Sequence, residues 1–381
     1  MSQLLPHLPI IFSIIGFRTR IMTRSNGQKK MKIQIIFFLL LLLIACTTDD
    51  QIQFSGTVGD AWSIPKEEVI SGAGKDAIAA IDTPVFSEAA QIAYLQDDDR
   101  VLVMKIGQMT KVYPLNILNW HEIVNDEIAE KSITISYCPL TGTGISWDRQ
   151  VDGTKTTFGV SGLLHHSNLI AFDRDSDSYW SQIRTDCLHG SLIGRRLRHY
   201  SMIEMPWSSL QHMIPDAEIL TEETGFDLPY SSYPYYDYRT NHDLFLVPVE
   251  FDDNRLPAKE KVFGIIVQNE AKVYPFTAFE PNRLNIINEV FRGQPIVILC
   301  HPGLGFTTAY KSNIDGQVLN FSPVRNDENI VMIDHQGHTW NLFGEDTDSQ
   351  DHIRNLSQLK SMSGYWFAWT KFFPRVEIYP E

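Results

Sequence analysis

The feature that most restricts the fold of this chain is an internal repeat. The same landmarks return in the same order at offsets between 159 and 163 residues. The matched landmarks are Lys111–Pro114 with Lys272–Pro275, Ile123–Asp126 with Ile286–Glu289, Cys138 with Cys300, Asp173 with Asp334, Trp180 with Trp340, and Trp207 with Trp366. Because so many ordered matches are improbable by chance, we expect one unit of roughly 120 residues to occur twice.

Each copy is expected to consist mainly of short strands. Runs of β-branched and aromatic residues alternate with Gly and Asp, which is typical of strands joined by tight turns. The strands expected in the first copy are Val101–Ile106, Lys111–Tyr113, Ser132–Tyr137, Gly144–Trp147, Thr156–Val160 and Leu169–Phe172. Two helices are expected, at 114–124, where Pro114 occupies the first turn, and at 206–213.

The fold class that follows is β-rich α+β, with two tandem related lobes of short strands and a few short helices. The first lobe is 101–220 and the second is 262–381, with 221–261 as the connection. Because the connection is rich in tyrosine, we expect it to pack across both lobes, with ring faces buried and hydroxyls in water. A ligand-stacking surface is the alternative.

The first 45 residues are interpreted as an export signal with its true start at Met31. The apolar run that ends at Ala45 has about 11 residues, whereas a span of a bilayer needs about 20. Residues 43–46 (Leu-Ile-Ala-Cys) fit a lipobox, in which Cys46 is lipidated after cleavage. We therefore expect a lipoprotein of the cell envelope, periplasmic or surface-exposed, with 46–100 as a tether and leading segment. An ordinary signal peptide or a transmembrane anchor is the alternative.

The charge of the chain argues against nucleic acid as a partner. The net charge is −14, and it becomes −20 when residues 1–45 are removed, because they contain six basic residues and no acidic ones. A protein this acidic gains nothing from the release of counterions around phosphates. Besides the membrane that the lipid anchor would contact, the expected partner is a small molecule or another envelope protein.

A histidine, a carboxylate and a thiol lie close together in the first lobe. His121 and Glu122 are near the end of the expected helix, and Cys138 ends a strand. Imidazole and thiolate suit copper or zinc, and they also form nucleophile–base pairs. The second copy has Leu284 and Asn285 instead of the His-Glu pair, which favours a functional role for that pair. We predict Cys138, His121 and Glu122 as catalytic residues, and His121 and Cys138 as metal ligands.

Three functions remain open. The first is a lipoprotein whose first lobe binds copper or zinc for redox or hydrolytic chemistry. The second is a non-catalytic binding or scaffold lipoprotein, and the third is a metal-free Cys-His hydrolase or transferase. The chain lacks a phosphate-binding loop and a dinucleotide fingerprint, which argues against phosphoryl and hydride transfer.

Two further pairs of residues have alternative interpretations. Cys138 and Cys300 occur in both copies, so either can be a small buried hydrophobic residue, and a disulfide between them is a second alternative. His165 and His166 follow Ser161-Gly162 in an expected loop, where we expect solvent exposure and keep metal ligation as the alternative.

Several motifs of the first copy together resemble a bacterial family called "domain of unknown function 3179". They are Tyr113-Pro114, His121–Asp126, Tyr137–Gly142, Phe158–Gly162, Asp173 and Trp180–Gln182. The resemblance covers roughly 85–381 and implies no particular activity. Many members of that family have a second cysteine where this chain has Thr141, and this departure from the family pattern argues against a dithiol redox role for Cys138 and position 141.

Overall fold

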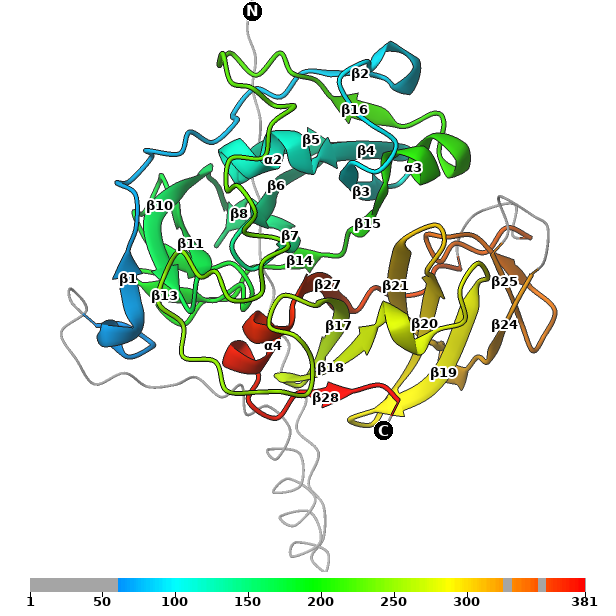
Figure 1. The fold of residues 1–381 in the computed structure, drawn as a ribbon. Helices are drawn as coiled ribbons and strands as arrows, with labels where there is room; N and C mark the ends of the chain where they lie inside the picture. Colours follow the sequence, from blue (N-terminus) through cyan, green and yellow to red (C-terminus); the bar gives the residue numbers. More distant parts are fainter. Residues whose placement is uncertain (1–60, 325–330, 349–353, 381) are drawn as a thin grey trace, which may run out of the picture. The chain divides into compact units, whose positions relative to one another are not determined.

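The computed structural model describes residues 61–324, 331–348 and 354–380, which are shown as a ribbon in Figure 1. The predicted signal segment and Cys46 lie outside the described residues. Most regular structure in the described part is antiparallel β-sheet, so the predicted β-rich α+β class is confirmed. The three α-helices there have seven residues each: α2 Leu115–His121, α3 Trp207–Met213 and α4 Trp366–Phe372. None of the described helices has the length and apolar character that a bilayer crossing requires.

The strands before residue 221 form three main sheets. Their bounds are β1 Val69–Ser71, β2 Phe86–Glu88, β3 Arg100–Ile106, β4 Met109–Pro114, β5 Ile123–Ile128, β6 Lys131–Cys138, β7 Thr143–Asp148, β8 Gln150–Val151, β9 Thr154–Lys155, β10 Phe158–His165, β11 Asn168–Asp173, β12 Tyr179–Ser181, β13 Cys187–His189, β14 His199–Tyr200, β15 Ile203–Pro206 and β16 Glu218–Leu220. The strand orders are β1-β10-β11-β12-β13, β14-β7-β6-β5 and β15-β3-β4-β16-β2. A separate pair is β8-β9.

The strands after residue 260 also form three main sheets. Their bounds are β17 Lys261–Val267, β18 Glu270–Pro275, β19 Asn285–Phe291, β20 Gln294–His301, β21 Phe306–Lys311, β22 Asn313–Ile314, β23 Gln317–Val318, β24 Phe321–Pro323, β25 Met332–Asp334, β26 Thr339–Trp340, β27 Lys360–Tyr365 and β28 Glu377–Ile378. The strand orders are β27-β17-β18-β28, β19-β20-β21 and β24-β25-β26, with β22-β23 as a separate pair. Three short 3₁₀ helices complete the described part: η1 Lys66–Glu68, η2 Ala89–Gln91 and η3 Phe276–Ala278.

The same order of strand pairing occurs in both parts. The order β15-β3-β4-β16 corresponds to β27-β17-β18-β28, and the pairs β4-β16 and β18-β28 are both parallel. Equivalent buried contacts accompany it. The indole of Trp180 donates to Asp173 at 2.9 Å, and that of Trp340 donates to Asp334 at 3.1 Å. The duplication stays a prediction. A duplicated unit would require the same pairing order in both copies.

The hydrophobic core joins the two parts of the chain. One core cluster contains Phe158 and Trp180 of the first part together with Trp366 of α4. A second cluster contains Trp207 of α3 together with Trp340 of the second part. Each part thus buries the helix near its end in a cluster that contains strands of the other part.

The connection 221–261 also packs into these clusters. It has no helix or strand between β16 and β17, both of which are described. Tyr230 joins the cluster of the first part, and Tyr238 joins the shared cluster of α4. The Tyr238 hydroxyl donates to the carbonyl oxygen of Leu140 at 2.8 Å, which fixes the connection beside the end of β6.

Candidate functional site

His121 is the last residue of α2, and both of its ring nitrogens have protein partners. Nδ1 lies 2.6 Å from the carbonyl oxygen of Ala79, so it donates there. Nε2 then accepts from the Tyr230 hydroxyl at 2.6 Å. The side chain is 1% exposed, and burial lowers the pKa of His121. The imidazole is therefore neutral at pH 7, and it offers no free nitrogen to a metal in this arrangement.

Glu122 caps α2 in a conformation that side chains rarely adopt. Its φ is +59°, which turns the chain from the helix into β5. Non-glycine residues with positive φ are uncommon and cluster at functional sites. The carboxyl group is 6% exposed, and its described partner is the Tyr235 hydroxyl at 3.4 Å. Burial raises the pKa of Glu122 to about 7.

Cys138 ends β6 and is fully enclosed. The thiol is directed to the carbonyl oxygen of Ser167 at 3.5 Å, and the residue is 1% exposed. Burial, followed by the nearby carboxylate of Glu122, raises the pKa of Cys138 to about 11. A thiol with this pKa needs a base before it can act as a nucleophile.

The structure thus brings together two of the three predicted catalytic residues. Glu122 and Cys138 are electrostatic neighbours, while His121 directs its ring to Ala79 and Tyr230. Among the described residues, these three side chains do not form a group with converging ligand atoms. The roles assigned to them stay predictions. The alternative of a Cys138–Cys300 disulfide is wrong, since both thiols are free.

A buried polar network lies beside Cys138. The Asn168 amide donates to the Thr141 hydroxyl at 2.9 Å and to the Gln182 side-chain oxygen at 2.6 Å. The Thr143 hydroxyl donates to the same oxygen at 2.8 Å. Thr141 is fully buried, and its hydroxyl is committed to this network. Thr141, which stands where many family members have a second cysteine, therefore has a structural role in this chain.

The hairpin between β10 and β11 connects this region to a second site. His165 is paired with Asn168, so His166 and Ser167 form a two-residue turn. Their φ values are +49° and +63°, as in a type I′ turn, where Asn and Gly are the usual residues. The carbonyl oxygen of Ser167 receives the Cys138 thiol, so the turn contacts Cys138 on one side.

Glu68, His165 and His166 form a cluster on the other side of this turn. Glu68 ends η1, and the next residue, Val69, is paired with His165 across the sheet. The Nε2 atoms of His165 and His166 lie 3.1 and 3.4 Å from the same oxygen of Glu68. All three ligand atoms lie within 4.8 Å of one another, and the described part of the chain has one such group.

The unusual turn explains how two adjacent histidines reach one point. Successive side chains of a strand point to opposite faces, so neighbouring histidines cannot share a ligand there. The positive φ of His166 breaks this alternation, and the two imidazole rings lie 4.1 Å apart. The ring of Phe372 in α4 packs edge-on against both, at 5.2 and 5.6 Å.

The environment keeps both imidazoles neutral at pH 7. Burial lowers the pKa of His165, and burial together with His165 lowers that of His166 to about 4. His165 is 5% exposed, and its Nδ1 has no hydrogen-bond partner among the described residues. Neutral imidazoles with a carboxylate are a ligand set that zinc and copper accept. The cluster can therefore hold a metal ion.

Metal ligation by His165 and His166 was the alternative expectation from the sequence, and Glu68 was missed. We expected His165 and His166 in an exposed loop, whereas His165 ends a strand and is buried. Nothing singled out Glu68, which is 97 residues away from His165 in the sequence. The two adjacent histidines were the feature of the sequence that pointed to a metal site. The continuation of the strand from Gly162 to His165 was not predicted.

These features define a β-rich protein with a His-His-Glu cluster beside a buried thiol. The sequence matches the family described as "Protein of unknown function (DUF3179)" over residues 75–376, and the chain therefore belongs to that family. The resemblance predicted from the motifs is confirmed. No curated protein and no solved structure matches the chain.

Proposed function

We propose that this protein is an exported lipoprotein that binds one transition-metal ion at Glu68, His165 and His166. The convergence of their three ligand atoms within 4.8 Å carries the proposal. Ligands about 2.1 Å from a tetrahedral zinc ion are roughly 3.4 Å apart. The two distances from Glu68 to the imidazoles, 3.1 and 3.4 Å, are already close to that separation.

The ligand set favours a reactive metal centre over a purely structural one. Three protein ligands leave a coordination position for water or substrate, as in catalytic zinc sites. Structural zinc sites are instead closed by four protein ligands. Bound zinc would supply hydrolytic chemistry, and bound copper would supply redox chemistry. The neutral imidazoles of this chain would bind either ion without first losing a proton.

A second candidate function is a metal-free thiol enzyme, and the unpaired carboxylate of Glu122 favours it. A buried carboxylate with no cationic partner destabilises the folded state, and such groups are frequent at functional sites. In this function Glu122 accepts the proton of the Cys138 thiol, which leaves a thiolate nucleophile beside the turn of Ser167. A scaffold without chemistry would need neither the metal ligands nor this carboxylate.

Elemental analysis of the soluble form that starts after Cys46 tests the metal proposal. We expect about one equivalent of zinc or copper per chain after loading with either ion. His166→Asn should lose the ion, because an amide replaces the imidazole while asparagine still tolerates a positive φ. His335→Asn, at an exposed histidine outside the cluster, should keep it. Full metal content in His166→Asn, or none in the wild type, would contradict the proposal.

Fractionation of cells tests the anchor. The motivating observation is the Leu-Ile-Ala-Cys motif at 43–46, directly after a short apolar run. Cys46→Ser removes the thiol that would be lipidated, so the protein should leave the membrane fraction or remain at the length of its precursor. Unchanged membrane association together with unchanged electrophoretic mobility would rule the lipoprotein out.

A further inference from the structure

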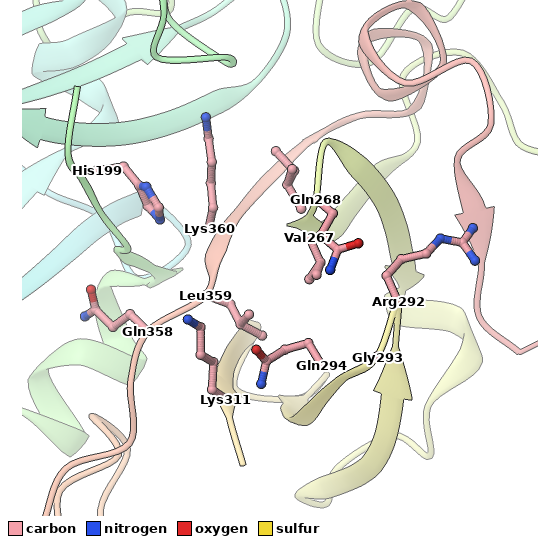
Figure 2. Close-up of a pocket in the computed structure, with 11 residues that line it drawn as sticks. His199, Val267, Gln268, Arg292, Gly293, Gln294, Lys311, Gln358, Leu359 and Lys360 are labelled. Carbon is pink, nitrogen blue, oxygen red and sulfur yellow. The ribbon is translucent and has the colours of Figure 1, made fainter. Parts of the chain in front are cut away.

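A pocket unrelated to the metal cluster lies where both parts of the chain meet. Its volume is about 360 Å³. The first part contributes His199 at the start of β14. The second part contributes most of the lining, including the polar residues Lys311, Lys360, Gln268, Gln294 and Gln358. Figure 2 shows His199, Lys311 and Gln358 on one side and Gln268 on the other.

The ionisable groups that line this pocket are all basic. They are His199, Arg292, Lys311 and Lys360, and no carboxylate lines it. The whole chain has 46 acidic and 32 basic residues, so the pocket is basic in a protein whose net charge is negative. Local positive charge of this kind attracts anions in a protein that otherwise repels them.

Arg292 does not contribute to this excess of positive charge. It is paired with Glu270 and Glu377, and in Figure 2 its guanidinium points away from the other lining side chains. Lys311, by contrast, has no ion-pair partner within the described ranges. Its ammonium group is therefore available to a ligand.

Lys360 adds positive charge beside the pocket, but in Figure 2 its ammonium points away from Lys311 and the glutamines. Its ammonium donates to the carbonyl oxygen of Arg184 at 2.7 Å and to the Thr185 hydroxyl at 2.9 Å. Burial lowers the pKa of Lys360 to about 7, with Asp186 opposing and two arginines adding to the shift. An anion bound nearby would stabilise the charged form of Lys360.

The pKa of His199 is lowered by burial and by the same positive charges. Burial, then Lys360, Lys311 and Arg198, lower its pKa to about 4. The imidazole is therefore neutral at pH 7, and it can donate one N–H without adding charge. Gln358 accepts from the backbone N–H of Ser201 at 3.1 Å, and its amide N–H groups have no described partner.

We propose that this pocket binds a small molecule that carries an oxyanion group, which is a carboxylate, phosphate or sulfate, on a polar body. Lys311 holds the oxyanion, Lys360 adds to the positive charge nearby, and the amides of Gln268 and Gln358 contact the polar body. The volume lies at the lower end of the range for small-molecule sites, which favours a ligand of roughly monosaccharide size over a macromolecule. None of these residues belongs to the metal cluster, so this proposal does not depend on the metal.

Thermal unfolding and calorimetric titration of the soluble form test the proposal. The probes are inorganic phosphate, sulfate and citrate, each at constant ionic strength set with sodium chloride, and glucose is the neutral probe. We expect saturable binding of at least one anion and none of glucose. The anion that binds most tightly distinguishes phosphate, sulfate and carboxylate ligands.

Lys311→Met should weaken the binding of that anion about tenfold or more, because one charge-assisted hydrogen bond is lost. Lys131→Met, at an exposed lysine outside the pocket, is the control and should bind as the wild type does. Lys311→Gln, which keeps N–H donors without the charge, covers the case in which the methionine variant does not fold. No saturable binding by any anion, or equal losses in the Lys311 and Lys131 variants, would overturn the proposal. Metal content should be unchanged in all of these variants.

Discussion

Two buried glutamates of this protein have opposite environments. Glu204 is 5% exposed and accepts hydrogen bonds from Arg100 and Lys261. These cations outweigh the effect of burial and lower the pKa of Glu204. Glu122 is 6% exposed and has no cation, so burial raises its pKa to about 7. Cations compensate the buried charge of Glu204, whereas the charged form of Glu122 has no cation to stabilise it and is therefore costly.

This contrast predicts how Glu122→Gln changes stability with pH. The folded protein binds the Glu122 proton with a pKa of about 7, whereas the ordinary value is 4.5. Between these values the folded state holds the extra proton, so stability falls as the pH rises through this window. Above pH 7 the buried carboxylate of Glu122 is ionised, and the free energy of unfolding is lower by about 3 kcal/mol. Glu122→Gln should therefore raise the free energy of unfolding at pH 8 by up to about 3 kcal/mol, with little change near pH 4.5.

Urea denaturation at both pH values checks this expectation. Glu204→Gln is the matched control, and it should lower stability at pH 8 by about 1–3 kcal/mol, because it leaves two partly buried cations without their partner. Glu122→Gln should also slow alkylation of Cys138 if the carboxylate is the base for that thiol. Equal destabilisation of Glu122→Gln at both pH values would assign this residue to the fold alone.

At the scale of elements, the local pattern of the sequence located most strands and helices. The expected strand Ser132–Tyr137 lies within β6, and the expected helix 206–213 matches α3. The expected helix 114–124 ends earlier, at His121, because the positive φ of Glu122 turns the chain into β5. Amphipathic pattern and turn residues act locally, so these elements were predictable.

The strand β10 shows why the metal cluster was not predictable in the same way. We expected this strand to end at Val160, with the residues after Ser161-Gly162 in a loop. Instead, the register shifts between Val160 and Leu163, and the strand continues to His165. Gly162 has a φ of +76°, and a Cβ atom there would lie 1.8 Å from the carbonyl oxygen of Ala73. The glycine therefore serves a β-bulge and a close crossing of the chain, which no local pattern reveals.

The site as a whole is assembled from distant segments. Glu68 comes from the start of the described chain, the histidines come from the β10–β11 hairpin, and Phe372 comes from α4 near the end. Sequence spacing predicts contacts within a hairpin, whereas these contacts depend on how α4 packs on the first part. The residues around Cys138 were predictable in part, because Glu122 and Cys138 lie on paired strands or directly beside them.

At the scale of the molecule, the shared core clusters predict that both parts of the chain unfold together. Trp366 of α4 is fully buried in the cluster that contains Trp180, and Trp207 of α3 is 3% exposed in the cluster that contains Trp340. Each tryptophan stabilises both parts at once. Trp366→Ala and Trp207→Ala should each lower the free energy of unfolding by about 3–5 kcal/mol.

Denaturation followed by tryptophan fluorescence and by circular dichroism tests this expectation. Because each cluster joins the two parts, both variants should keep a single transition that coincides in the two signals. Tyr236→Ala, at a side chain that is 89% exposed, should change stability by less than about 0.5 kcal/mol. If the parts were independent lobes, Trp366→Ala would instead destabilise one lobe and split the transition in two. A second transition in either tryptophan variant would therefore contradict the shared core.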